Sequence, residues 1–369
     1  IRSFIFTGFP WLSFGYSQVE KSPLSGYLPI IGIHGITFLI LFTVIVLFKT
    51  ISIDDKKTKL LFALLVIFLW LTGHIFKKIE WTNQIEKPIS LSLLQGNISQ
   101  DQKWDKANIS SSLSKYLSMI ESSDASLIIL PETSIPIIKS QLPNYFKDRI
   151  SKHAQKINGN IIYGIIEEEN GKYFNSAISE GVDGSQKYRK FHLVPFGEFI
   201  PFKVFFKYIY QHWLNIPFSD LSRGSIPQKP ITIGDSKIAI NICYEDVFGN
   251  EIIKTLPEAN ILVNISNDAW YGESIASQQH LQISQARAIE TGRMMIRSTN
   301  TGATAIINPK GRVISQFPLF EKGILHGYAY GFEGTTPYVK YGNFPIIFFS
   351  WVIVIFCLLR RKKIADNKV

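Results

Sequence analysis

The chain has 369 residues, enough to bury one large core or two medium ones, and 46% of its residues are hydrophobic. A formal net charge of +10 is compatible with nucleic-acid binding, but no recognition motif accompanies it. Much of the excess charge instead lies in short clusters beside long apolar runs, so we expect membrane topology, and not nucleic acid, to explain it.

Two apolar runs near the N-terminus are long enough to be membrane spans. Residues 29–48 contain no Asp, Glu, Lys or Arg, and residues 60–76 form a second run. In a helix, such runs approach about 30 Å, the thickness of the hydrocarbon core. A third run, 344–359, covers about 24 Å and would need flanking residues or local thinning of the bilayer. The alternative is that these runs are buried helices of a soluble core.

Basic clusters predict the orientation of these spans. The loop 49–59 carries four lysines, and the tail 360–369 carries two arginines and three lysines. Both should lie in the cytoplasm. We therefore expect a membrane region at 1–79, an external domain at 80–342, and a C-terminal helix with a basic cytoplasmic tail at 343–369.

The sequence before the first span gives two further expectations. It begins with Ile1 rather than Met. A basic segment, a short apolar core and a small-residue cleavage site do not follow one another there, so we predict no signal peptide. We expect instead that the sequence is truncated at its N-terminus.

The external domain alternates strand-like and helix-like segments. Near-continuous apolar runs that alternate with helices indicate a sheet covered on both faces, hence an α/β layered fold. The strand-like runs are 89–95, 126–132, 160–166, 237–243 and 261–266. The helical candidates are 108–122, 142–157 and 275–291.

Two of these runs end in residues that can do chemistry. Glu132 follows one apolar run and Cys243 closes another, and functional groups in such folds gather where strands end. Each has a structural alternative: Glu132 as a helix cap or turn residue, and Cys243 as a small buried hydrophobe. Because the other cysteine, Cys357, lies in the last apolar run, a disulfide between the two is excluded. A free thiol outside the cytoplasm indicates a use.

A thiol needs a base or a positive neighbour to react near neutral pH. The candidates are Glu132, Lys190 and His192, the last two in a structured segment at 188–202. Chemistry alone leaves the choice between Lys190 and His192 open, and a Cys–His pair is a fair alternative.

A family resemblance narrows this choice. The order of PETSIP (131–136), RKFHLVPFGEFIP (189–201) and NICYEDVFG (241–249) resembles the Glu, Lys and Cys motifs of the nitrilase superfamily. Together with QGNISQDQKWD (95–105) and residues 266–302, these segments are similar to the apolipoprotein N-acyltransferase family. The similarity extends to residues 6–18, before which that family usually has several more membrane helices. It implies a nitrilase-like α-β-β-α domain inserted between transmembrane helices.

The resemblance also implies roles for particular residues. Cys243 would be the nucleophile, Glu132 the general base and Lys190 the essential lysine. Glu198 corresponds to a further active-site glutamate, whose role stays open, and His192 would be structural. Residues that would support the site are Tyr244, Glu245 and Trp104. No metal or cofactor is implied, and His280 has no Cys or acidic partner at metal-ligand spacing.

The reaction implied is N-acylation of the diacylglyceryl-cysteine of bacterial apolipoproteins, with phosphatidylethanolamine as the phospholipid donor. The expected place is the inner membrane, with the catalytic domain of a monomer on the periplasmic side. One competing interpretation is a membrane-tethered amidase, and another is a non-catalytic interaction protein with a nitrilase-like domain. The aromatic stretch 199–213 could contact lipid or be a covered core loop.

Overall fold

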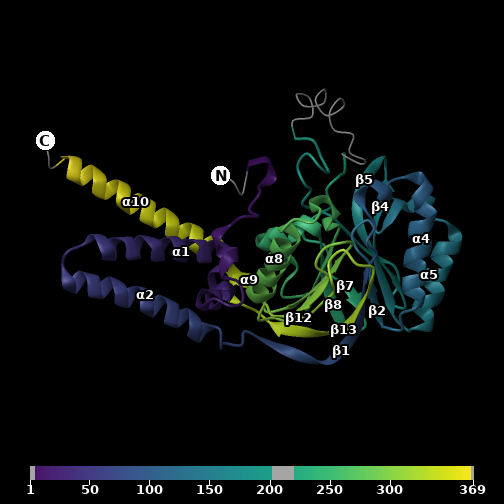
Figure 1. Cartoon of the computed structure of the whole chain (residues 1–369), viewed down its shortest axis with the longest axis horizontal. Coiled ribbons are helices and arrows are strands. Elements are labelled where there is room, and N and C mark those ends of the chain that lie inside the picture. The colour runs from purple at the N-terminus through teal and green to yellow at the C-terminus, as the bar shows by residue number, and fades with distance from the viewer. Residues whose placement is uncertain (1–4, 202–219, 367–369) are drawn as a thin grey trace.

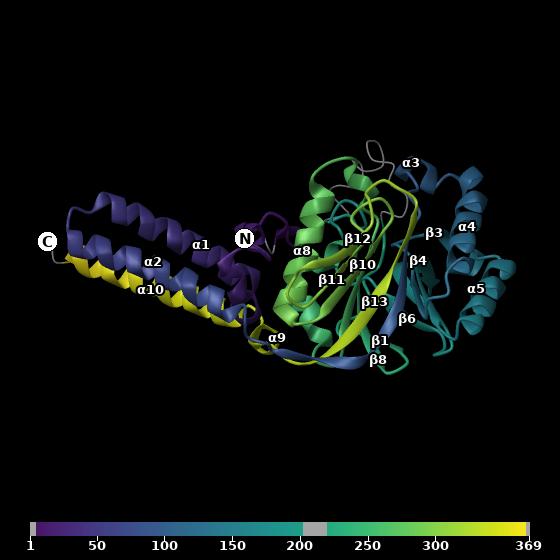
Figure 2. The same ribbon diagram turned by 60° about the horizontal axis from the view of Figure 1, so that its bottom comes forward.

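The computed structural model describes residues 5–201 and 220–366. The domain that follows the first two long helices has four layers, with two sheets packed face to face and helices on both outer surfaces (Figures 1 and 2). The α-β-β-α arrangement expected from the family resemblance is confirmed. The stretch 202–219, which holds most of the aromatic segment predicted to contact lipid, lies outside the described residues.

Strands of the described chain form two sheets, both mixed in direction. One sheet has the order β13-β1-β2-β4-β5-β6, with β3 beside β4, and the other has the order β12-β11-β10-β9-β8-β7. The strands of the first sheet are β1 Thr82–Gln95, β2 Leu127–Ile129, β3 Ile135–Ile138, β4 Asn160–Glu169, β5 Lys172–Gly181, β6 Gln186–Arg189 and β13 Gly323–Gly334. Those of the second are β7 Ile231–Ile233, β8 Ser236–Ile242, β9 Ile261–Ser266, β10 Met294–Thr299, β11 Ala305–Ile307 and β12 Val313–Gln316.

Alternation along the strands explains the layers. In β9, Ile261, Val263 and Ile265 point into the core between the sheets, whereas Leu262 packs outward with Leu281 of α8. The first sheet likewise packs outward against the covering helices α4 and α5. Strands buried on both faces read as continuous apolar runs, which is why the five runs predicted from the sequence fall on β1, β2, β4, β8 and β9.

The predicted helices of the domain are present, with ends shifted by a few residues. They are α4 Lys106–Glu121, α5 Asn144–Lys156 and α8 Ala276–Thr291, accompanied by the short helices α3 Gln100–Lys103, α7 Gly249–Ile252 and α9 Pro337–Tyr341. The strand predicted at 126–132 is longer than the one observed. β2 ends at Ile129, and the chain then turns at Thr133, whose φ is 44°.

The apolar runs form long helices that project from the domain (Figure 1). These are α1 Leu28–Ser52, α2 Lys56–Phe76 and α10 Phe344–Asp366. By length and composition α1 and α2 could cross a membrane, and the apolar part of α10, Phe344–Arg360, is shorter. Only 6% of the most apolar window of α2 is buried, so α2 is not a core helix of a soluble domain.

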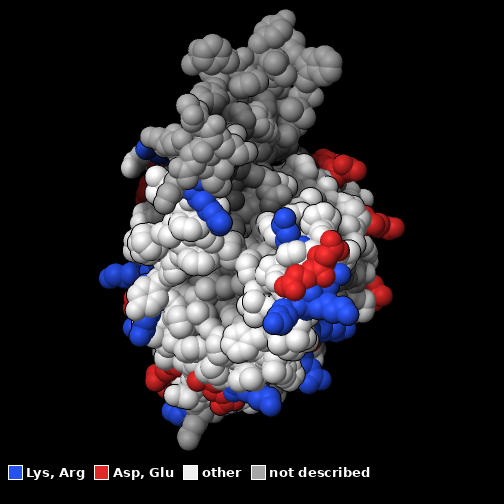
Figure 3. All heavy atoms as spheres, turned by 90° about the vertical axis from the view of Figure 1, so that its left-hand side faces the viewer, with Lys and Arg blue, Asp and Glu red and all other residues white. Residues whose placement is uncertain are grey.

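Charged residues mark the far end of this helical projection. Asp55 caps α2 by accepting hydrogen bonds from the backbone N–H groups of Lys57 and Thr58. The end of α10 lies at the same end of the molecule as the α1–α2 turn (Figures 1 and 2). Figure 3 views this end and shows acidic and basic side chains gathered in a patch on a mostly uncharged face.

A break in α1 anchors the helices to the domain. Gly32 has a φ of +61°, and the break leaves the N–H of Ile33 free to donate to Oε1 of Glu290 on α8, at 2.7 Å. Glu290 in turn pairs with Arg287 at 3.0 Å, as expected for an i,i+3 pair on one helix face. A Cβ on Gly32 would lie 2.3 Å from the ring of Tyr338 in α9.

We expect Gly32→Ala to lower the melting temperature of the detergent-solubilised chain much more than Gly184→Ala does. Both glycines have positive φ, but a Cβ on Gly184 would meet nothing within 4 Å. Gly184→Ala therefore carries only the backbone cost of a positive φ, about 1–2 kcal/mol. Gly32→Ala carries the cost of a φ of 61° with a ψ of −173°, a conformation almost confined to glycine, and in addition the clash with Tyr338. Equal shifts in the two variants would contradict this anchor.

Candidate active site

Glu132 lies in the turn after β2, between the two sheets. Its Oε1 accepts hydrogen bonds from Nδ2 of Asn175 at 2.7 Å and from Nζ of Lys190 at 3.2 Å. Its Oε2 accepts from the backbone N–H of Asn267 at 3.0 Å. Burial would raise the pKa of Glu132, but the charges of Lys190 and Lys103 hold it below the ordinary value. The buried carboxylate is therefore ionised at neutral pH.

Lys190 follows β6 and is paired with two carboxylates. Its Nζ also lies 3.0 Å from Oε1 and 2.9 Å from Oε2 of Glu198. Asn175 joins the two acids, because its Nδ2 donates to Glu198 at 2.9 Å as well as to Glu132. Burial would lower the pKa of Lys190, but the charges of Glu132 and Glu198 raise it well above the ordinary value. Lys190 is thus a fixed ammonium and cannot serve as a base near neutral pH.

Cys243 comes from the second sheet, at the sharp turn between β8 and the 3₁₀ helix Cys243–Val247. Its φ of +54° is strained for a residue with a side chain, and such strain is often found at functional sites. Burial and the charge of Glu132 raise the pKa of the Cys243 thiol, against the opposing charge of Lys190. At rest, a protonated thiol therefore shares the site with an ionised carboxylate.

Glu245 ties the turn at Cys243 to the segment that carries Lys190. Its Oε1 accepts from the backbone N–H groups of Phe191 and His192 at 2.7 and 3.0 Å. Its Oε2 accepts from the N–H of Ile242 at 2.7 Å, and the hydroxyl of Tyr188 donates to both oxygens at 3.0 Å. Burial raises the pKa of Glu245 to about 7, while these backbone hydrogen bonds oppose the rise.

The other residues named from the sequence, Tyr244, Trp104 and His192, each contact a different neighbour. Tyr244 donates from its hydroxyl to the carbonyl of Gly8 at 2.9 Å and stacks on Phe9, which holds the segment before α1 against the site. Trp104 is half-buried and packs beside Leu193 and Leu221, so it contacts the segment after Lys190. His192 hydrogen-bonds Glu251 through Nδ1, at 2.9 Å, and stacks on Phe248.

Lys103 is a buried residue of the site that the sequence did not single out. Its Nζ donates to the backbone carbonyl of Glu132 at 3.1 Å. Burial lowers the pKa of Lys103 to about 7, although the charge of Glu132 acts in the opposite direction. The neighbouring Trp104 motif was the signal that could have drawn attention to it.

A buried network beneath Cys243 was also missed. Nε2 of His280 lies 2.9 Å from Asp246 and 3.3 Å from the carbonyl of Cys243, and its Nδ1 lies 2.9 Å from Asp268. Arg297 donates to both aspartates, and Asn264 donates to the Cys243 carbonyl at 3.0 Å. Burial and Arg297 would lower the pKa of His280, but the two aspartates raise it to about 9.

The acidic partners of His280, Asp268 and Asp246, precede it by 12 and 34 residues, which is not the short spacing of metal-ligand motifs, so they were not predicted from the sequence. Within residues 5–201 and 220–366, no cluster of His, Cys, Asp and Glu is arranged to hold a metal ion. The network instead fixes the backbone on which Cys243 sits.

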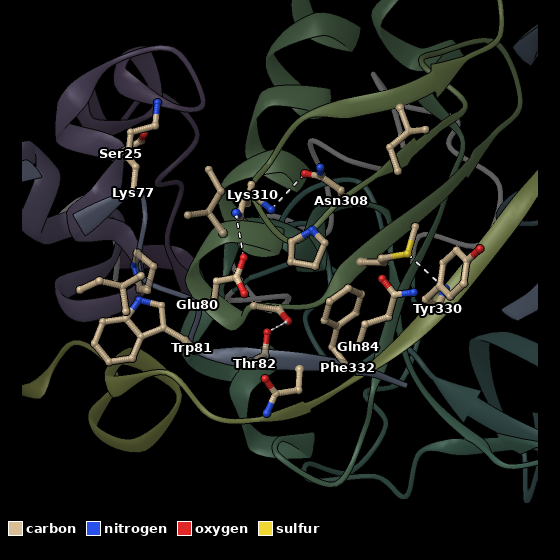
Figure 4. Close-up of a pocket in the computed structure, with 18 of the residues that line it drawn as sticks. Ser25, Lys77, Glu80, Trp81, Thr82, Gln84, Asn308, Lys310, Tyr330 and Phe332 are labelled. Carbon is tan, nitrogen blue, oxygen red and sulfur yellow. Dashed lines mark hydrogen bonds and ion pairs between the residues drawn. The ribbon is translucent and has the colours of Figure 1, made fainter. Parts of the chain in front are cut away.

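A cavity of about 840 Å³ lies elsewhere, where the end of α2 joins β1 (Figure 4). Trp81 and Thr82 line it, and Lys310 pairs with Glu80 at its edge, at 3.3 Å. The described residues around this cavity include none of those predicted for the active site.

We expect Glu245→Gln to increase the mobility of the segment that carries Lys190 and of the turn at Cys243. A glutamine side chain offers one acceptor oxygen and turns an NH₂ group toward N–H donors, so buried hydrogen bonds worth about 1–3 kcal/mol each are lost. Amide hydrogen exchange followed by mass spectrometry should then rise at least tenfold in peptides covering 188–193 and 238–243. Glu251→Gln is the matched control, because the described hydrogen bonds of the Glu251 carboxylate to this segment go to the His192 ring alone. Unchanged amide exchange in Glu245→Gln would contradict the inference that Glu245 links these two segments.

Comparisons with known proteins identify the family of the chain. A carbon-nitrogen hydrolase model matches residues 90–327, and a model of the apolipoprotein N-acyltransferase N-terminal domain matches residues 1–46. The apolipoprotein N-acyltransferase of Nitrosomonas europaea is 45% identical over 93% of this chain and 69% of its own length. That of Chromobacterium violaceum is 38% identical over 97% of this chain and 70% of its own length.

A solved structure supports the same fold. The C. elegans NitFhit protein superposes with a TM-score of 0.51 and 17% identity, covering 69% of this chain and 62% of that one. The carbon-nitrogen hydrolase match spans more than half of the chain, and the N-acyltransferase relatives align with both its helices and its domain. The chain therefore belongs to the carbon-nitrogen hydrolase superfamily and, within it, to the apolipoprotein N-acyltransferase family.

Proposed function

We propose that the chain transfers an acyl group from a phospholipid to the α-amine of the diacylglyceryl-cysteine of an apolipoprotein. One observation carries the proposal: a site with Glu132, Lys190 and Cys243 is joined in one chain to long, exposed apolar helices. An amidase acting on small soluble amides has no need of such helices. Both lipid substrates do, because extracting an acyl chain from a bilayer costs about 0.8 kcal/mol per CH₂ group.

In the first half-reaction, Glu132 accepts the proton of Cys243 as the sulfur attacks the ester carbonyl of the phospholipid. The resting states support this order, because the thiol is protonated and the carboxylate ionised. The ammonium of Lys190 stabilises the oxyanion that forms, and Glu198 holds that ammonium in place. Glu132 then returns the proton to the departing glycerol oxygen, so that a lysophospholipid leaves and a thioester remains on Cys243.

In the second half-reaction, the neutral α-amine of the apolipoprotein attacks the thioester carbonyl. Lys190 again stabilises the oxyanion, and Glu132 accepts a proton from the attacking nitrogen. The C–S bond breaks, an amide forms, and the proton passes to the sulfur to restore the thiol. Donor and acceptor thus use the same carboxylate and ammonium in turn, as a covalent nucleophile requires.

We also propose that α1, α2 and α10 cross the bacterial inner membrane, with the domain that begins near residue 80 on the periplasmic side. The lysines of the α1–α2 turn and the end of α10 lie at the same end of the molecule, away from the domain (Figure 1). The positive-inside rule then assigns that end to the cytoplasm. Cys243 would lie on the outer side, next to the membrane surface.

The thioester gives a direct test. After the purified chain is mixed with dioleoyl phosphatidylethanolamine, intact mass spectrometry should show the addition of one oleoyl group, mapped by proteolysis to Cys243. Cys243→Ser should abolish this thioester and Cys357→Ser should keep it, while Glu132→Gln should slow its formation about 10²–10⁴-fold. A diacylated lipopeptide should remove the acyl group faster than water does. Absence of any adduct in the folded chain, or equal loss to water, would contradict the proposal.

A further inference from the structure

Lys103 is a buried lysine without a carboxylate partner. Its side chain is 2% exposed, and within residues 5–201 and 220–366 no carboxylate oxygen lies within 4.0 Å of its Nζ. An ammonium has three N–H donors, whereas the described acceptor is the backbone carbonyl of Glu132, 3.1 Å away. Fully buried lysines are almost always paired, and a methionine would fill the same space without the cost of burying an amine. The reason for a lysine at this position therefore lies with Glu132.

The helical turn that carries Lys103 reaches Glu132 by two routes. This turn is α3, and the first route is the hydrogen bond from Nζ of Lys103 to the Glu132 carbonyl. The second begins at Gln100, whose Oε1 accepts from Nδ2 of Asn267 at 2.9 Å. The backbone N–H of Asn267 in turn donates to Oε2 of Glu132 at 3.0 Å. One short helix thus fixes both the main chain and the carboxylate of Glu132.

Glu132 shares its other cation with a second carboxylate. Nζ of Lys190 lies 3.2 Å from Glu132 and 2.9 Å from Glu198. Lys103 supplies a further positive charge that lowers the pKa of Glu132, against the effect of burial. Below neutral pH, two ammoniums therefore face two carboxylates, while the thiol and the phenol beside them stay protonated. The titratable groups of this centre are Lys103, Lys190, Glu132, Glu198, Cys243 and Tyr271.

Lys103 becomes charged in the pH range where Glu132 needs protection. Burial lowers the pKa of Lys103 to about 7, whereas the pKa of Glu132 lies below its ordinary value. As the pH falls through neutral, a proton therefore binds Lys103 before one binds Glu132. The new charge on Lys103 then opposes protonation of Glu132. The carboxylate stays ionised, and able to accept the proton of Cys243, on the acid side of neutral.

We propose that Lys103 is a positioning residue for the reaction, whose ammonium fixes the main chain of Glu132 and keeps its carboxylate ionised as the base for Cys243. The proposal rests on the proposed function for one point, that Glu132 accepts the proton of Cys243. Lys103 acts through Glu132 and not on the substrate. Its removal should therefore change the pH dependence of Cys243 chemistry and not simply its rate.

Alkylation of Cys243 by iodoacetamide reports the state of Glu132 without any lipid. In the full detergent-solubilised chain carrying Cys357→Ser, Cys243 is the one remaining cysteine of the sequence. Its sulfur displaces iodide while Glu132 takes the thiol proton and passes it to water. The rate, followed by intact mass spectrometry, should therefore fall at low pH as Glu132 becomes protonated. We call this fall the acid limb. Glu132→Gln should abolish the acid limb, and a limb that persists would overturn the proposal.

Variants of Lys103 then test its charge. Lys103→Met should move the acid limb to higher pH by about one unit or more, the shift that one neighbouring charge produces. Lys103→Gln, which keeps a donor for the Glu132 carbonyl but no charge, should move it in the same direction. Lys103→Arg, which keeps the charge, should retain the limb of the parent chain. The melting temperature of each variant checks that it is folded.

A matched control comes from a second lysine that hydrogen-bonds the main chain. Nζ of Lys115 donates to the carbonyl of Gly96 at 3.4 Å, and no carboxylate oxygen lies within 4.0 Å of it among the described residues. Lys115→Met should leave the acid limb where it is. If Lys103→Met instead slows alkylation by the same factor at every pH, with the limb in place, Lys103 is merely structural and the proposal is wrong.

The parent chain supplies a test even where the Lys103 variants do not fold. Its acid limb should lie below about 4.3, the ordinary pKa of a glutamate, and a limb above this value would overturn the proposal. The outcomes also separate Lys103 from the proposed function. A shifted limb in Lys103→Met, with no acylation of Cys243 by phospholipid, would support the role of Lys103 and refute the proposed function. An unshifted limb in a chain that phospholipid does acylate would refute the role of Lys103 alone.

Discussion

The carboxylate of Glu245 is the contact on which the rest of the site depends, because the reacting groups come from two different sheets. Glu132 and Lys190 follow strands of one sheet, whereas Cys243 follows β8 of the other. Glu245 accepts hydrogen bonds from the segment after β6 and from Ile242 at the end of β8. Its two oxygens thus set the spacing between the ammonium of Lys190 and the sulfur.

The backbone at Cys243 is fixed by a second set of contacts, in addition to those of Glu245. A positive φ at a cysteine costs free energy and persists only where the surroundings enforce it. Asn264 and His280 reach the Cys243 carbonyl, and Asp246 and Asp268 hold His280 in turn. Because every ionic group in this network is paired, it can remain charged in the core without a large penalty. A rigid turn then presents the sulfur to the ammonium and carboxylate opposite.

The long helices are anchored to the domain by another buried carboxylate, that of Glu290. Glu290 on α8 accepts the N–H that the break at Gly32 frees, so the first turns of α1 are fixed to the helix layer of the domain.

Much of the fold was predictable from the sequence because its signals are local. Buried strands read as apolar runs, Glu132 and Cys243 stand where two such runs end, and Lys190 lies in a segment that resembles a family motif. What could not be predicted depends on contacts between distant segments. Asn175 reaches Glu132 across 43 residues, and His280 meets Asp246 across 34, and no periodicity in the sequence indicates that these residues are in contact.

The central claim is that the acyl group rests on Cys243 between donor and acceptor. Steady-state initial rates, with phospholipid and diacylated lipopeptide varied independently in detergent micelles, test it most directly. A covalent intermediate predicts parallel lines in double-reciprocal plots, with lysophospholipid released before the lipopeptide is bound. Intersecting lines, with lysophospholipid released only when the lipopeptide is present, would mean direct transfer within a ternary complex and would contradict the account.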